Sequence, residues 1–126
     1  MNKEALTRLA YLASNSEYNE DNKTEFRKLG RKFLNEIVKE MGLKKGEYDI
    51  RWNPGGPAVS GDYTLHTDWF YLALTDNLNM GWFYYRQCEG RKDYCGKINR
   101  QFYWDSLIKD GVKGLVNAIN SDCPKP

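Results

Sequence analysis

The residue of this chain with the clearest capacity for acid–base chemistry is His66, its only histidine. The ordinary pKa of histidine lies near neutral pH, so this side chain can both take up and release a proton there. Phosphoesterases built on paired His-x-Thr motifs require two histidines, one for each proton transfer, and this chain has one. We therefore interpret His66 as a side chain that is hydrogen-bonded on a strand.

A small enzyme that uses His66 stays open as a third hypothesis. The histidine could activate a nucleophile, for which Ser60, Cys88 and Cys95 are the candidates, or it could act together with Asp62. Nothing in the spacing of these residues brings them beside His66, and no reaction class follows from them. We favour a binding protein over an enzyme.

Neither a metal ion nor a cofactor is expected. Cys88 and Cys95 are separated by six residues. That is wider than the roughly two to four residues within the ligand pairs of structural zinc sites, and no second pair follows. The glycine-rich stretch Pro54–Pro57 has neither the lysine nor the following helix of a phosphate-binding loop, so we interpret it as a turn.

A basic segment with interleaved aromatic residues runs from Arg86 to Arg100. It carries five basic and two acidic residues, a local excess of three positive charges. Arginine beside stacking aromatic rings is typical of sites for nucleotides or single-stranded nucleic acid. Arg51 and Trp52 could join the same face; alternatively, this is a solvated loop whose rings pack under the sheet. The candidate binding residues within the segment are Arg86, Arg91, Lys92, Tyr94, Lys97 and Arg100.

Alternation along the strands also predicts an aromatic patch. Trp69 and Tyr71 would share one face of their strand, and Trp82 and Tyr84 one face of the next. The opposite face would meet the helices through Phe70, Leu72, Leu74, Phe83 and Tyr85. An exposed patch of Trp, Tyr and Arg has the composition of a protein-binding hot spot. Burial of that patch by loops, or in a homodimer, is the alternative.

The composition predicts one soluble domain. The chain has 126 residues, of which 40% are hydrophobic and 29% charged, and its net charge is +2. The near-neutral total gives no argument for nucleic acid or membrane. The first 14 residues lack the apolar stretch of a secretory signal, and three cysteines fit a reducing compartment. We expect a cytoplasmic protein.

The periodicities predict an α+β fold with helices packed on one face of an antiparallel meander of about four strands. A helical part over 1–46 precedes the sheet and basic loop over 47–104. The expected helices cover 3–14, 22–41 and 105–120, and the expected strands cover 48–52, 58–67, 68–74 and 81–87, with a loop over 88–102 that could end in a strand.

Capping residues predict where the helices begin and end. Asn22 with Glu25 three residues later has the pattern of a capping box, and Gly42 is suited to end the same helix. Asp105 would cap the last helix, which Gly111 and Gly114 weaken by about 1 kcal/mol each relative to alanine.

The stretches Ala58–Asp68 and Gly90–Gly96 resemble a loose group of small proteins carried by phages, plasmids and other mobile elements. The resemblance covers about residues 50–100 and not the helical beginning of the chain. It implies a context, because such accessory proteins often bind and disable a host machine such as a defence complex. It assigns no functional residue.

The leading hypothesis is a non-enzymatic accessory protein that binds and inhibits a host protein, for example a defence target as anti-CRISPR proteins do. It would use the aromatic face and the Arg86–Arg100 segment. The alternative is a protein that binds or sequesters a nucleotide or single-stranded nucleic acid through the same residues.

Overall fold

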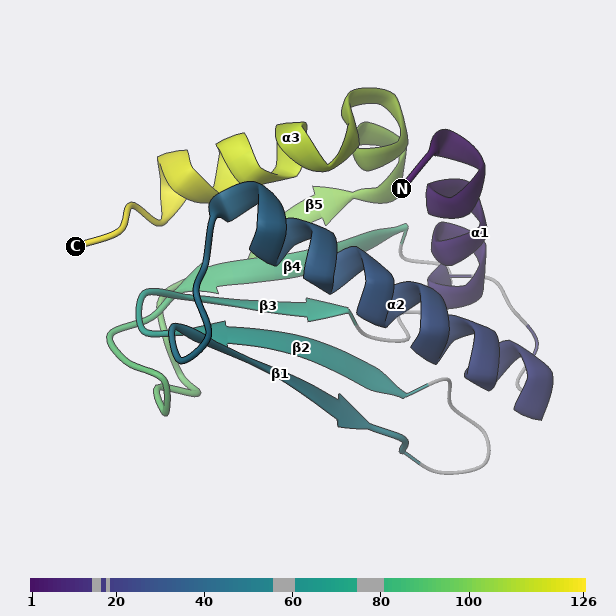
Figure 1. Cartoon of the computed structure of the whole chain (residues 1–126), viewed down its shortest axis with the longest axis horizontal. Coiled ribbons are helices and arrows are strands. Elements are labelled where there is room, and N and C mark those ends of the chain that lie inside the picture. The colour runs from purple at the N-terminus through teal and green to yellow at the C-terminus, as the bar shows by residue number, and fades with distance from the viewer. Residues whose placement is uncertain (15–16, 18, 56–60, 75–80) are drawn as a thin grey trace.

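A computed structural model describes residues 1–14, 17, 19–55, 61–74 and 81–126. Three helices lie on one face of an antiparallel sheet (Figure 1). The fold is therefore α+β, as the sequence predicted. In chain order the elements are α1 (Lys3–Ser14), α2 (Glu20–Met41), β1 (Tyr48–Asn53), β2 (Asp62–Thr67), β3 (Phe70–Leu74), β4 (Trp82–Gln87), β5 (Arg100–Tyr103) and α3 (Trp104–Asp122).

The sheet has five strands in the order β1-β2-β3-β4-β5, one more than the sequence predicted. The additional strand, β5, pairs antiparallel with β4 at the end of the expected loop. Residues 56–60 and 75–80 lie outside the described part of the chain. The first part of the expected strand over 58–67 falls there.

The core forms between the helices and the near face of the sheet. Leu65, Leu72 and Tyr85 lie side by side across β2, β3 and β4, and all three are buried. From the helices, Phe33 packs edge-on against Phe83 with ring centroids 6.0 Å apart. The predicted helix-facing residues are all buried in this core, which confirms the prediction: Phe70, Leu72, Leu74, Phe83 and Tyr85.

The N-cap of helix α2 lies three residues earlier than predicted. Its N-cap is Asn19, whose Oδ1 accepts a hydrogen bond from the backbone N–H of Asn22 at 2.9 Å. The predicted capping box is wrong because Glu25 instead forms a double hydrogen bond with Arg8 of α1, at 2.8 and 2.7 Å. The helix ends at Gly42, with φ of 67°, as predicted.

Helix α3 is bent. It begins at Trp104, and Asp105 lies in the first turn rather than at the cap. Gly111 adopts φ of 75° and ψ of −176°, which divides the helix into two segments. The second segment is held to the sheet by Tyr85, whose hydroxyl donates to Asp122 Oδ2 at 2.5 Å.

Candidate functional site

The loop between β4 and β5 folds back over the sheet face that the helices leave open. The Tyr94 ring lies over His66 with centroids 6.4 Å apart, and Arg51 Nη1 donates to the Tyr94 hydroxyl at 3.1 Å. The Tyr94 carbonyl oxygen accepts a bond from Arg86 Nη2 at 2.6 Å. Tyr94 thus contacts residues of β1, β2 and β4 at once.

Arg86 is the buried centre of this contact, with 8% of its surface exposed. Its guanidinium lies 4.2 Å from the ring centroid of Tyr71, and Nη1 donates to Asn99 Oδ1 at 3.3 Å. A Cβ added at Gly96, whose φ is +55°, would lie 2.6 Å from Arg86 Nε. The loop therefore needs glycine at this position to close over the arginine.

Arg91 ties the loop to β1 and to the turn before β3. It donates to Asp68 Oδ1 at 3.3 Å, to Asp49 Oδ2 at 3.2 Å and to the Gly46 carbonyl at 3.0 Å. Two carboxylates thus compensate its charge within the chain. The loop itself is ordered by Asp93, and the backbone N–H groups that donate to it hold the pKa of that carboxyl below its ordinary value.

His66 is buried beneath this loop, with 6% exposed. Burial, and then the positive charge of Arg51, lower its pKa to about 4, so the imidazole is neutral at neutral pH. Among the described residues its side chain has one hydrogen-bond partner, Thr64 Oγ1 at 2.8 Å. The expected hydrogen-bonded state is therefore present.

Among the described residues, no hydrogen bond joins His66 to Cys88 or Cys95, the two predicted cysteine nucleophiles. Cys88 is buried and its Sγ lies 3.6 Å from the Thr67 carbonyl oxygen, while Cys95 is exposed on the loop. Burial raises the pKa of the Cys88 thiol, which disfavours the reactive thiolate. Ser60 lies outside the described residues.

Three residues of the predicted binding set do not lie on the open face. Trp52 faces α2 while Arg51 faces the other way, because side chains alternate along β1. Trp69 precedes β3 and is 6% exposed. Arg100 turns toward α3, where its Nη1 lies 3.9 Å from Asp122 Oδ1. The expectation that Trp52 joins Arg51 and that Trp69 joins the aromatic patch is wrong.

The open face retains an aromatic patch over β4 and β5. Trp82 lies opposite Tyr103, and Tyr84 lies opposite Gln101. Tyr103 is 52% exposed. The sequence indicated a possible strand at the end of the loop over 88–102 but did not place Tyr103 in the patch. Lys92 and Lys97 of the predicted set are exposed on the loop, which joins β4 and β5 at the end of these strands opposite to Trp82 and Tyr103.

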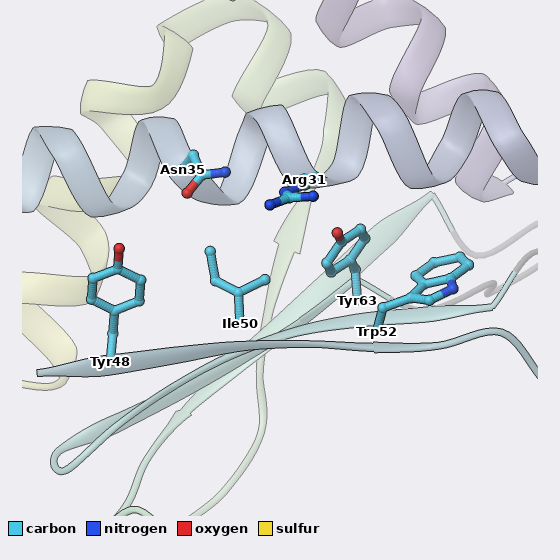
Figure 2. Close-up of a pocket in the computed structure, with 6 residues that line it drawn as sticks. All are labelled: Arg31, Asn35, Tyr48, Ile50, Trp52 and Tyr63. Carbon is cyan, nitrogen blue, oxygen red and sulfur yellow. The ribbon is translucent and has the colours of Figure 1, made fainter. Parts of the chain in front are cut away.

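A second surface lies on the opposite side of β1, where the sequence predicted none. A cavity of about 390 Å³ opens between α2 and β1 (Figure 2). Side chains of β1 and β2 form its floor, and Arg31 and Asn35 reach down from α2 (Figure 2). The floor residues are Tyr48, Ile50, Trp52 and Tyr63.

Trp52 joins this cavity to a smaller neighbour of about 150 Å³. Its ring lies 5.0 Å from Tyr63 and 6.1 Å from Phe26, and the Arg27 guanidinium lies 5.4 Å from its centroid. The second cavity continues to Pro54 at the end of β1. The two cavities follow one another between α2 and β1, with Trp52 lining both, and we call this surface the α2–β1 groove.

The helix side of the α2–β1 groove carries a basic row. Lys23, Arg27, Arg31 and Asn35 line the two cavities and recur every fourth residue. Residues at this spacing lie one above another on a helix. Arg27 and Arg31 form no ion pair within the described part of the chain. The spacing was visible in the sequence, but only the fold shows that this row faces a groove.

The strand side of the groove presents backbone groups to solvent, because β1 is an edge strand. Thr64 Oγ1 lies 3.5 Å from the Arg51 carbonyl oxygen, so Arg51 directs that oxygen toward β2. Backbone direction alternates along a strand, and therefore Ile50 and Trp52 direct their N–H and C=O groups away from the sheet. Those groups are suited to pair with another extended chain.

The described residues contain no cluster of three or more His, Cys, Asp or Glu side chains placed to hold a metal ion. No helix in that part of the chain is long and apolar enough to span a membrane. No protein-family model, curated protein or solved structure matches the chain.

Proposed function

We propose that the chain is a non-enzymatic protein-binding domain that holds an extended segment of a partner in the α2–β1 groove. The observation that supports this most directly is the outward N–H and C=O groups of Ile50 and Trp52 beside an aromatic cavity. Peptide recognition by strand addition uses these two features, main-chain hydrogen bonds for affinity and side-chain pockets for specificity.

The open face of the sheet is the second candidate surface. Its aromatic patch of Trp82, Tyr84 and Tyr103 has the composition of a binding hot spot. Its arginines are less available than the sequence suggested, because Arg86 is buried and Arg91 is paired with two carboxylates. We therefore place the primary contact in the groove.

The resemblance to phage and plasmid accessory proteins directs the proposal toward a host partner. Inhibition of a host protein, including a component of a defence complex, would follow if the segment held in the groove is needed by the host machine. This part of the proposal rests on the resemblance and not on the geometry.

Selection from a displayed library of random twelve-residue peptides tests the groove. Asn35→Trp fills the cavity from an exposed helix position, and Lys109→Trp adds the same side chain on the exposed face of α3. We expect peptides that bind the parent chain and Lys109→Trp but not Asn35→Trp. Absence of any enriched peptide, or equal binding to both variants, would contradict the proposal.

A nucleotide or single-stranded nucleic acid is the competing ligand, because Arg27 over Trp52 within a basic row could also hold a base and its phosphate. Such binding would weaken steeply with salt. Titration of tryptophan fluorescence with deca-thymidylate and cyclic nucleotides at low and high salt distinguishes the two. A salt-sensitive signal that is lost in Arg27→Ala would favour the nucleic acid.

A further inference from the structure

We propose that the segment held in the α2–β1 groove is acidic, with carboxylates at alternate positions, and that it pairs with β1 as a sixth strand. This inference rests on the proposed function and specifies the chemistry of its partner. It follows from three features of the groove: the direction of the backbone groups of β1, the spacing of the basic row on α2, and the distribution of charge on the two faces beside β1.

The backbone of β1 determines where an added strand would lie. Ile50 and Trp52 direct their hydrogen-bonding groups outward, and their side chains form the floor of the groove. A strand paired with β1 would lie about 4.8 Å further out and continue the same sheet. Every second side chain of that strand would then project on the side of the sheet where α2 lies.

The basic row of α2 has the right spacing to meet those side chains. Residues four apart on a helix are about 6 Å apart along its axis, and residues two apart on a strand are about 6.6 Å apart. Figure 2 shows α2 running alongside β1, with Asn35 above the Tyr48 end and Arg31 nearer Trp52. Successive alternate side chains of the added strand would therefore approach Arg31, Arg27 and Lys23 in turn.

The charge of the groove selects acidic side chains at these positions. Its charged lining residues are Lys23, Arg27 and Arg31, with Glu20 at one end. Because Arg27 and Arg31 have no carboxylate partner in the described part of the chain, a ligand can supply one. On the other face of β1, Asp49 Oδ2 lies 3.7 Å from Arg51 Nη2. Because this arginine already has a carboxylate partner, that face does not favour an acidic side chain of the ligand.

The test uses synthetic eight-residue peptides with glutamate and threonine in alternation. The comparison peptides replace each glutamate with lysine, or keep the composition with the four glutamates contiguous. We expect the alternating acidic peptide to bind most tightly by calorimetry and to shift the Trp52 indole and Ile50 amide signals in NMR spectra. Equal binding of the contiguous peptide would overturn the alternate placement.

Two variants of α2 measure the ion pairs. Arg27→Ala/Arg31→Ala removes the row, and Lys28→Ala/Lys32→Ala makes the same charge change at exposed positions one residue further along. We expect a Kd about five- to tenfold weaker in the first variant and unchanged in the second, as two exposed ion pairs would give. An equal loss in both variants would mean attraction by net charge only, and would overturn the inference.

Methylation of the peptide nitrogens tests the strand pairing separately from the charges. In a strand, alternate residues direct their N–H groups to opposite sides. Methylation of one alternate set should abolish binding and methylation of the other should not; which set matters gives the direction of the added strand. Tolerance of both methylated peptides would overturn strand addition.

The outcomes separate this inference from the proposed function. Displayed peptides that need the groove but show no acidic preference would overturn the inference and leave the proposed function standing. Failure of every peptide to bind would overturn both. Binding of deca-thymidylate in the groove, with no binding of the acidic peptide, would overturn both in favour of nucleic acid.

Discussion

The ring of Tyr94 stands edge-on over the imidazole of His66, at an interplanar angle of 80°. Tyr94 also contacts two arginines, Arg51 through its hydroxyl and Arg86 through its carbonyl oxygen. A proton on His66 would thus be added beneath a covering ring and between positive charges. Protonation of His66 is therefore unfavourable while the chain is folded.

Stability should therefore depend on pH through His66. Its pKa is about 4 in the folded chain and about 6.5 when unfolded, so between these values the unfolded chain binds the extra proton. We expect stability to be unaffected by this group above pH 6.5 and to fall as the pH decreases toward 4. After allowance for partial solvent screening the loss is roughly 2 kcal/mol. Urea unfolding at a series of pH values measures it.

The control for this experiment is His66→Gln, which keeps a hydrogen-bonding side chain of similar length without the titration. Its stability should change less between pH 6.5 and pH 4 than that of the parent chain. Parallel curves for the two proteins would show that other groups cause the dependence.

Gly96 should be far less tolerant of alanine than Gly90. A Cβ at Gly96 would meet Arg86 at 2.6 Å, and its φ of +55° is unfavourable for other residues, whereas nothing lies within 4 Å of a Cβ at Gly90. We expect Gly96→Ala to lower the free energy of unfolding by about 1–3 kcal/mol. Gly90→Ala should stay within about 0.5 kcal/mol of the parent. Thermal unfolding compares the two variants. Equal midpoints would contradict the close packing of Gly96 against Arg86.

The order of elements was predictable because local signals and tertiary packing agree in most of the chain. Gly42 ends α2 in the left-handed conformation that glycine favours. The apolar residues at alternate positions of β3 and β4 are buried against the helices, as the alternation in the sequence predicted. Glu25 had two possible partners, the backbone in a capping box and the side chain of Arg8 in α1. The sequence did not decide between them.

The site was less predictable because it depends on contacts between distant segments. Trp69 was assigned to a strand, but Thr67 Oγ1 accepts hydrogen bonds from the backbone of Trp69 and Phe70, at 3.2 and 2.9 Å. That turn removes Trp69 from the alternation. The groove required Arg27 and Trp52 to meet from separate elements, which no local pattern indicates.

Tyr85 should contribute more to the free energy of unfolding than the burial of its ring alone provides. Its hydroxyl donates a hydrogen bond to Asp122 of α3, and only 2% of the residue is exposed. Tyr85→Phe keeps the ring and leaves Asp122 without this donor, so we expect a loss of about 1–2 kcal/mol. Tyr103→Phe, at an exposed position, should cost about 0.5 kcal/mol or less. Chemical denaturation compares them, and equal losses would mean that the hydrogen bond does not hold α3 to the sheet.

Cys95 should be the first of the three cysteines to react in the folded chain. It is exposed on the loop of the open face, while Cys88 and Cys123 are buried, and burial raises the pKa of the Cys123 thiol to about 11. We expect iodoacetamide to modify Cys95 first in the folded chain, and the other two only after unfolding, as measured by peptide mass spectrometry. Simultaneous modification of all three would contradict this burial.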